Sequence, residues 1–274
     1  MSALMVAEIG INHNGDINIA KQLIDIAHFS KCNYVKFQKR DILQVYSKEE
    51  LDKPRESPWG TTTREQKEGL ELSCDDFNEI DRYCKGKIGW FASPWDVNSL
   101  DFLGMHPGCA FIKLPSPLIT NERLLASCHN YDKQVILSTG MSNMEEIDRA
   151  IEALGRKKIY AILACTSTYP TKNEEINLNF IKTLKRIYPW AKIGFSNHSP
   201  GIIFMPVAVA LGAEIIEFHV TLNRSMYGSD QPSSFEPEGV MKLRKYIDGV
   251  EQAMGDGVKQ VYASEIPIKE KLRR

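Results

Sequence analysis

Apolar, β-branched runs recur along this chain at intervals of roughly 25 to 30 residues, and helical patterns fill the gaps between them. We expect strands near residues 4–9, 34–38, 88–93, 110–114, 135–139, 160–166, 193–196 and 214–220. Helices fit near residues 17–30, 74–84, 98–103, 122–130, 144–154, 178–188, 202–211 and 237–253. Eight strand–helix units in a chain of 274 residues predict an α/β fold, the (β/α)₈ or TIM barrel.

An open, doubly wound sheet is the alternative arrangement for this pattern. It requires a glycine-rich phosphate-binding fingerprint after the first strand, and the sequence has none there. Residues 39–73 form a long polar stretch with Pro54 and Pro58, which indicates a functional loop after the second strand rather than a domain boundary. Since no linker or low-complexity segment divides the chain, we expect residues 1–274 to form a single TIM-barrel domain.

The composition limits the partners of the chain. Its net charge is −1, so it lacks the broad positive charge that attracts nucleic acid or an acidic membrane. No apolar run approaches the roughly 20 residues that span a bilayer, and the first residues lack the pattern of a secretory signal. Six cysteines are scattered without a CxxC pair, which favours reduced thiols and a cytoplasmic location.

Two histidines lie near the ends of consecutive predicted strands. His198 follows the apolar run at residues 193–196, and His219 lies near the end of the next run. Neighbouring parallel strands are about 4.8 Å apart, so the two imidazoles meet at one rim of the barrel. Imidazole suits Mn, Zn, Fe or Ni, and the pair therefore predicts one bound divalent metal ion. The alternative is that each histidine only forms hydrogen bonds within its loop.

The other strand ends also carry polar side chains, and in a barrel these ends build the active site. Lys36 and Lys113 each follow an apolar pair inside a strand, where a lysine is costly to bury unless it meets an anion. Each lysine either pairs with a core carboxylate, such as Glu8 or Glu217, or holds an anionic substrate. The hydroxyls on the same rim favour the substrate, because lysines and serines together bind phosphate or carboxylate. The remaining strand-end candidates are Gln38, Ser93, Ser116, Ser138, Thr139, Thr166, Ser167 and Ser196.

Seven motifs resemble the sialic acid synthase family, which includes the N-acetylneuraminate, legionaminate and pseudaminate synthases (NeuB-like proteins). They occur in the family's order and extend over nearly the whole barrel. The motifs are Ala7-Glu-Ile-Gly-Ile-Asn-His-Asn-Gly15, Val35-Lys-Phe-Gln38, Ala92-Ser-Pro-Trp-Asp96, Leu137-Ser-Thr-Gly-Met141, Cys165-Thr-Ser-Thr-Tyr-Pro170, Phe195-Ser-Asn-His-Ser199 and Glu217-Phe-His-Val-Thr-Leu-Asn-Arg224. The resemblance implies an aldol-type condensation of phosphoenolpyruvate with an open-chain sugar aldehyde, which gives a nine-carbon 2-keto acid and phosphate.

The resemblance also implies roles for individual residues. His198 and His219 match the ligands of the metal, which is Mn²⁺ or, as alternatives, Mg²⁺ or Co²⁺. Glu8 matches the carboxylate beside the reacting carbons, and Tyr169 and Asp230 match positions that line the sugar site and its metal-bound water. Gln38 shares a strand face with Lys36 and is a further candidate for binding substrate. The positions that match the phosphoenolpyruvate site are Lys36, Ser93, Lys113, Ser116, Ser138, Ser167 and Ser196.

Departures from the family pattern concern the acceptor sugar. The family's acid after Lys-x-x-Ser-Gly is Leu118 here, and the usual Ser-Asp-His and Glu-Lys-His read Ser196-Asn-His198 and Glu217-Phe-His219. The family normally adds a small C-terminal antifreeze-like domain that supplies an arginine to the sugar in a partner's site, and we expect no such domain in this chain. N-acetylmannosamine should therefore be a poor acceptor, unless a homodimer or a separate partner subunit supplies the missing contacts.

Two other functions are compatible with a barrel of this kind. One is an aldolase or isomerase that acts on a smaller sugar without phosphoenolpyruvate, and the other is a non-catalytic, synthase-like subunit. The many predicted anion donors argue against the first, and the intact set of Lys36, Lys113, His198 and His219 argues against the second.

Overall fold

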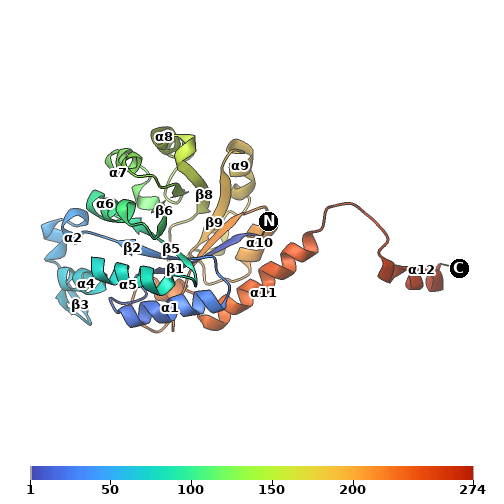
Figure 1. Cartoon of the computed structure of the whole chain (residues 1–274), viewed down its shortest axis with the longest axis horizontal. Coiled ribbons are helices and arrows are strands. Elements are labelled where there is room, and N and C mark those ends of the chain that lie inside the picture. Colours follow the sequence, from blue (N-terminus) through green and yellow to red (C-terminus); the bar gives the residue numbers. More distant parts are fainter. Residues whose placement is uncertain (1, 274) are drawn as a thin grey trace.

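The structure, a computed structural model, describes residues 2–273. Within them, eight parallel strands close into a barrel in the order β1-β10-β9-β8-β7-β6-β5-β2, which confirms the predicted TIM barrel (Figure 1). The strands are β1 (Leu4–Gly10), β2 (Tyr34–Lys39), β5 (Gly89–Pro94), β6 (Cys109–Leu114), β7 (Val135–Ser138), β8 (Ile159–Cys165), β9 (Lys192–Asn197) and β10 (Ile215–His219).

Helices cover the outside of the barrel, and a reciprocal side-chain cap starts the helix Met144–Leu154. Asn143 accepts a hydrogen bond from the backbone N–H of Glu146, whose carboxylate accepts one from the backbone N–H of Asn143. Each expected helix is present, with ends that differ by a few residues. The helices around the barrel are α1 (Ile17–Phe29), α5 (Cys74–Cys84), α6 (Val97–Met105), α7 (Glu122–Ser127), α8 (Met144–Leu154), α9 (Phe180–Ile187), α10 (Phe204–Ala210) and α11 (Pro237–Met254).

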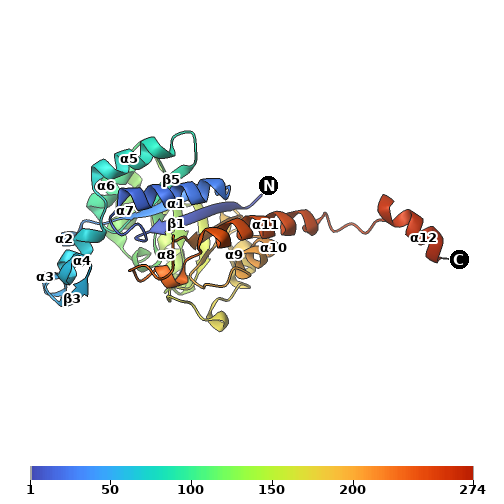
Figure 2. The same ribbon diagram turned by 90° about the horizontal axis from the view of Figure 1, so that it is seen from below.

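The stretch after β2, which we expected to be a loop, contains regular elements of its own. Short helices α2 (Ile42–Val45) and α3 (Lys48–Leu51) lead into a hairpin of β3 (Pro54–Ser57) and β4 (Gly60–Thr62), followed by α4 (Thr63–Leu70). A capping box between Thr62 and Glu65 starts α4, and this local signal was present in the sequence. The hairpin and α4 lie at the end of the barrel opposite the C-terminal arm (Figure 2).

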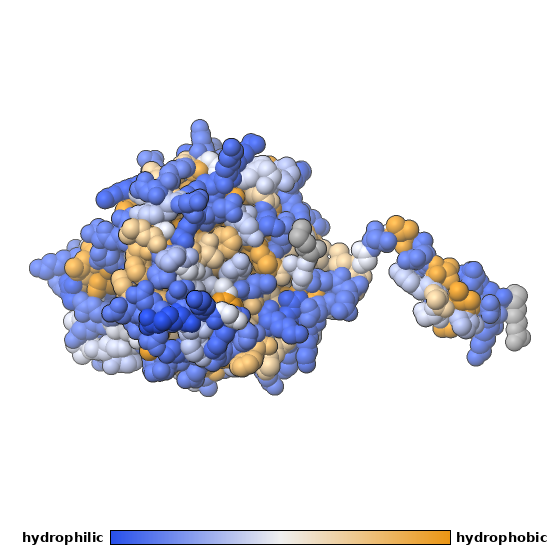
Figure 3. Space-filling model, in the orientation of Figure 1, coloured by the Kyte–Doolittle hydropathy of each residue, from blue (hydrophilic) through white to orange (hydrophobic). Residues whose placement is uncertain are grey.

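Beyond α11 the chain extends away from the barrel and ends in α12 (Ile266–Leu272) (Figure 1). Its apolar side chains, which include Ile266, Ile268 and Leu272, are exposed on this arm (Figure 3). Among the described helices, none is both long and apolar enough to cross a membrane. Short 3₁₀ turns complete the fold at η1 (Ser116–Leu118), η2 (Cys128–Asn130), η3 (Arg156–Lys158), η4 (Asn173–Glu175), η5 (Gln231–Ser233) and η6 (Ala263–Glu265).

Strand register decides which side chains meet inside the barrel. Glu8 on β1 lies level with His219 on β10 and with Lys36 on β2. On the other side of β10, Glu217 lies level with Ser196 on β9. Because residues two apart on a strand share a face, these polar side chains enter the barrel together at its carboxyl end.

Candidate active site

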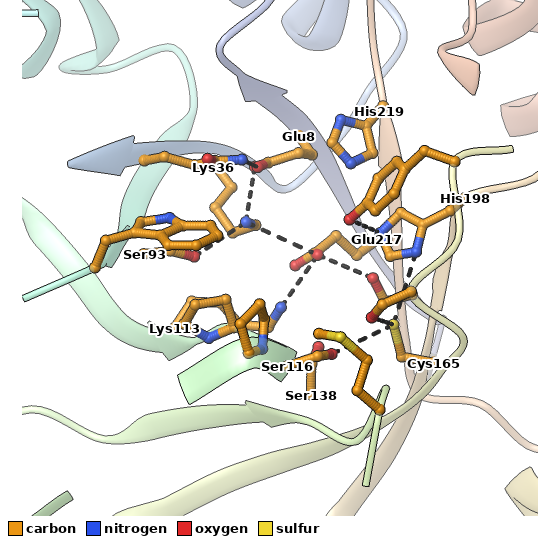
Figure 4. A pocket seen from close by; sticks show the side chains of 18 residues that line it. Glu8, Lys36, Ser93, Lys113, Ser116, Ser138, Cys165, His198, Glu217 and His219 are labelled. Carbon is orange, nitrogen blue, oxygen red and sulfur yellow. Dashed lines mark hydrogen bonds and ion pairs between the residues drawn. The ribbon is translucent and has the colours of Figure 1, made fainter. Parts of the chain in front are cut away.

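A cavity of about 140 Å³ opens at the carboxyl ends of the strands (Figure 4). Its size is below the roughly 300 to 1,000 Å³ of sites for drug-sized ligands, so it suits a small metabolite. Of the candidate site residues named from the sequence, all line it except Thr139, Thr166 and Asp230. The carboxylate Oδ2 of Asp230 lies 3.6 Å from Nδ1 of His219. The lining residues are Glu8, Lys36, Gln38, Ser93, Trp95, Lys113, Pro115, Ser116, Pro117, Ser138, Met141, Cys165, Ser167, Tyr169, Ser196, His198, Glu217 and His219.

Two buried ion pairs occupy the floor of the cavity. Lys36 Nζ lies 2.9 Å from Glu8 Oε2, and Lys113 Nζ lies 3.1 Å from Glu217 Oε1. Lys36 also lies 3.9 Å from Glu217, and the hydroxyl of Ser196 donates a hydrogen bond to the same carboxylate at 3.0 Å. The lysines therefore satisfy both interpretations of the sequence, since each has a carboxylate partner and each also faces the cavity.

The carboxylates of these pairs have different proton affinities. At Glu217, burial favours the neutral acid, but Lys113 and Lys36 outweigh it and lower the pKa to about 2. At Glu8, burial raises the pKa more than the ammonium group of Lys36 lowers it. Glu217 is therefore a fixed anion, and Glu8 is the carboxyl group that more readily holds a proton.

The two lysines also differ. At Lys36, burial lowers the pKa, but the carboxylates of Glu217 and Glu8 outweigh this effect and hold the pKa above its ordinary value. At Lys113, burial lowers the pKa more than Glu217 raises it. Both amines remain hydrogen-bond donors, and Lys36 donates to the hydroxyl of Ser93 at 3.2 Å.

Hydroxyl groups form one wall of the cavity around Gly140. The backbone N–H of Gly140 donates to Ser116 Oγ at 3.0 Å. A Cβ atom on Gly140 would lie 2.2 Å from Ser167 Oγ and 2.7 Å from Ser116 Oγ, so only glycine allows this approach. Ser138 Oγ is buried and has no hydrogen-bond partner within residues 2–273, which leaves it free to bind a ligand. The hydroxyls of this wall can donate hydrogen bonds to a bound anion.

The two histidines are oriented by oxygen atoms behind them. The ring centroids of His198 and His219 lie 5.4 Å apart. His198 Nδ1 lies 2.7 Å from the carbonyl oxygen of Thr166, and its Nε2 lies 2.9 Å from the hydroxyl of Tyr169. Burial, with the nearby charges of His198 and Lys36, lowers the pKa of His219 to about 4, although Asp230 opposes this. A neutral imidazole is the form that binds a metal.

This arrangement fits a metal ion held by two histidines. An oxygen atom faces Nδ1 of each ring, as is usual behind metal-binding histidines, so Nε2 would be the ligand atom. At His198 this atom contacts the hydroxyl of Tyr169, which a metal ion would displace. Among residues 2–273, the buried Nδ1 of His219 has no hydrogen-bond partner, so the polar contacts of this ring are incomplete. Across residues 2–273 no group of three or more His, Cys, Asp or Glu side chains could hold a metal, so water or substrate would supply the other ligands.

Sequence reasoning missed some residues of the cavity and misplaced one. Cys165 ends β8, and its Sγ lies 3.8 Å from His198 Nδ1. Burial favours the neutral thiol, but the nearby charges of His198 and Lys113 outweigh burial and lower the pKa of Cys165 to about 7. The position of Cys165 at the end of a predicted strand was the sequence signal that could have identified it as a site residue. Leu118, expected beside the acceptor, instead packs against the hydrophobic core, and Pro117 takes its place at the cavity.

A TIM barrel with buried lysines, hydroxyl donors and two histidines at its carboxyl mouth has the site of an enzyme for a small anionic substrate. The sequence model of the NeuB family matches residues 23–259. The chain belongs to the NeuB family, whose synthases use phosphoenolpyruvate and a divalent metal and form sialic-acid-like sugars.

Individual relatives differ in the sugar that their names specify. The chain is 36% identical to an N,N'-diacetyllegionaminic acid synthase of Campylobacter jejuni, over 96% of this chain and 80% of that protein. It is 33% identical to the human N-acetylneuraminate-9-phosphate synthase, over 98% of this chain and 76% of that protein. It is also similar to the crystal structure of an N-acetylneuraminic acid synthetase from Leptospira borgpetersenii in complex with citrate. That structure has a TM-score of 0.85 and 33% identity, with 100% of this chain and 93% of that chain covered.

Proposed function

We propose that this chain condenses phosphoenolpyruvate with an open-chain aldose and water to give a 2-keto-3-deoxy sugar acid and phosphate. The observation that carries the proposal is the convergence of Lys36, Lys113, His198 and His219 on one small cavity. An isomerase or aldolase without phosphoenolpyruvate would not need two buried lysines beside a wall of hydroxyls. The free thiols Cys32, Cys74, Cys84, Cys109, Cys128 and Cys165 favour a cytoplasmic location.

Phosphoenolpyruvate would lie between the lysines and the hydroxyl wall. Lys36 and Lys113 supply positive charge, and Ser138 supplies a hydroxyl that has no other partner among the described residues. The existing ion pairs are electrically balanced, so a bound polyanion needs further positive charge. The other donors toward it are Ser93, Ser116, Ser167 and Ser196.

His198 and His219 would hold a divalent ion, for which we propose Mn²⁺, with Mg²⁺ and Co²⁺ as substitutes. When bound, such an ion polarises the aldehyde oxygen as a Lewis acid and offsets the charge of the substrate. Asp230 and the carbonyl of Thr166 keep the two imidazoles in place.

The reaction joins the methylene carbon of phosphoenolpyruvate to the aldehyde carbon of the sugar. Water adds to the adjacent enol carbon, and the phosphate leaves from that carbon. Lys36 and Lys113 orient the enol phosphate for this attack. Glu8, which readily holds a proton and receives a 2.9 Å hydrogen bond from Gln38, is positioned to exchange protons with the reacting groups. Tyr169, half-exposed at the mouth, faces the acceptor side.

The acceptor side of the cavity is more apolar than the family pattern suggests. Pro117 lines it where the family pattern has glycine, and the side chain of Met141 is 63% exposed beside it. These groups cannot pair with sugar hydroxyls, and a site without such partners loses discrimination for them. We therefore propose an acceptor other than N-acetylmannosamine.

The test is phosphate release from phosphoenolpyruvate by the full chain with Mn²⁺, across a panel of aldoses. We expect kcat/KM for N-acetylmannosamine to be lower than that for at least one of mannose, arabinose and the diacetamido hexoses. Efficient and selective turnover of N-acetylmannosamine would contradict the acceptor assignment. Phosphate release with none of the aldoses, despite binding of phosphoenolpyruvate, would favour a non-catalytic subunit or one that needs a partner.

A further inference from the structure

Three segments that are distant in the sequence pack in series at the mouth of the barrel: the loop after β1, the β3–β4 hairpin with α4, and the loop after β10. Gly15 follows β1, Trp59 lies in the turn of the β3–β4 hairpin, Gly69 is near the end of α4, and Tyr227 lies in the loop after β10. We call these four residues the mouth clamp. None of them lines the cavity, and the reaction described above does not use them.

The glycines of the mouth clamp are required by close contacts. Gly15 has φ +71°, and a Cβ atom on it would lie 2.0 Å from the carbonyl oxygen of Gly69. A Cβ atom on Gly69 would lie 2.1 Å from Cγ of Trp59. No other residue fits either position without movement of the neighbouring backbone or indole. Helix α4 is therefore held directly against the loop after β1, and the indole of Trp59 packs on α4.

Trp59 carries this packing to the loop after β10. Its ring lies 5.5 Å from the ring of Tyr227, with an edge-on angle of 75°. Both side chains are half-buried, whereas residues 54–56 of the same hairpin are exposed. An isolated two-stranded hairpin is only marginally stable in water, so its packing through Trp59 ties it to the barrel mouth.

The loop after β10 places the carboxylate that faces His219. The carbonyl oxygen of Tyr227 accepts a 3.3 Å hydrogen bond from Nε2 of the buried Gln231. The hydroxyl of Ser234 donates to the carbonyl oxygen of Asp230 at 2.7 Å. From this position, Asp230 Oδ2 lies 3.6 Å from His219 Nδ1. A shift of Tyr227 would therefore shift Asp230 and change the contact between its carboxylate and the ring of His219.

We propose that Trp59 is a positioning residue, which acts through Tyr227 and Asp230 to orient His219. The role of His219 as a ligand rests on the proposed function, whereas the mechanical link from Trp59 to residues 222–230 does not. The lysines of the anion site belong to β2 and β6 and have their own carboxylate partners, so they are independent of the clamp. Loss of Trp59 should thus weaken metal and acceptor binding and spare phosphoenolpyruvate.

The test compares Trp59→Ala with the matched variant Trp59→Phe, which keeps an aromatic ring. Calorimetric titration of the full chain measures the Kd of Mn²⁺ and of phosphoenolpyruvate. Because loss of a group behind a metal ligand costs about tenfold or more in affinity, we expect Trp59→Ala to weaken Mn²⁺ by about tenfold. Trp59→Phe should stay near the wild type, and the phosphoenolpyruvate Kd should not change in either variant. Tyr227→Ala should have the same effect, and the double variant should be no worse than either single variant.

Hydrogen exchange of residues 222–230, measured without metal or substrate, provides an independent readout. Exchange should be faster in Trp59→Ala than in the wild type and in Trp59→Phe. Unchanged exchange would overturn the proposal, as would equal weakening of Mn²⁺ and phosphoenolpyruvate, which would indicate general disorder of the mouth. If the wild type binds no Mn²⁺, the metal assignment fails, and the exchange result alone decides the role of Trp59.

Discussion

Replacement of Lys113 by methionine separates the two roles of this buried lysine, which are to neutralise Glu217 and to bind phosphoenolpyruvate. The change removes the ammonium group 3.1 Å from Glu217, and the remaining cation, Lys36, is 3.9 Å from that carboxylate. At 3.1 Å and an effective dielectric constant of about 20, the lost attraction is about 5 kcal/mol. An uncompensated buried charge costs about 3–5 kcal/mol, and because Lys36 remains we expect the free energy of unfolding to fall by about 3 kcal/mol.

The same change should weaken phosphoenolpyruvate binding by at least about tenfold, or about 1.4 kcal/mol. Urea unfolding followed by circular dichroism measures the first effect, and calorimetric titration measures the second. The double variant Lys113→Met with Glu217→Gln removes both charges, so it should recover most of the stability. It should not recover phosphoenolpyruvate binding, because the donor is still absent.

Two results would refute this reasoning. Wild-type affinity for phosphoenolpyruvate in the double variant would show that Lys113 serves only to neutralise Glu217. An unchanged free energy of unfolding in Lys113→Met would show that the ion pair contributes little to the fold. The corresponding Lys36→Met variant should also bind phosphoenolpyruvate more weakly, since Lys36 faces the same cavity.

Three further predictions concern other parts of the mouth. His198→Ala and His219→Ala should each lose bound metal, as measured by metal analysis after dialysis; stoichiometric metal in both would exclude them as ligands. Gly140→Ala should weaken phosphoenolpyruvate by about tenfold or more in calorimetric titration, because its Cβ would displace Ser167 Oγ, 2.2 Å away. Burial lowers the pKa of His13 to about 4, so the unfolded state binds more protons between pH 4 and 6.5. The free energy of unfolding should fall by up to about 3 kcal/mol as the pH falls through this window, and less in His13→Asn.

Each of these has an outcome that contradicts it. Wild-type affinity in Gly140→Ala would show that the serine wall yields to the new methyl group. An equal pH dependence in the wild type and His13→Asn would assign the titration to other groups. Asparagine is the matched replacement because its side-chain oxygen can accept the 3.0 Å hydrogen bond that the backbone N–H of Gly15 donates to His13 Nδ1.

Local patterns in the sequence were sufficient to predict the barrel. Apolar alternation and helical periodicity depend on residues within one element, so the eight strands and the helices around them were found with small errors at their ends. Polar residues at the strand ends were equally visible, because a lysine such as Lys36 inside an apolar run has no local explanation. This is why the sequence could list most of the residues that line the cavity.

Only the tertiary structure decided how these residues pair. Contacts across the barrel, such as that between Lys113 and Glu217, depend on strand register and closure, which no local pattern encodes. The same holds for Trp59 and Tyr227, which are brought together by two separate loops. Leu118 follows a strand end and looked like a site residue, but in the 3₁₀ turn η1 it is partly buried and packs against the core. The sequence thus determined which groups reach the mouth of the barrel, and three-dimensional packing determined which partner each of them meets.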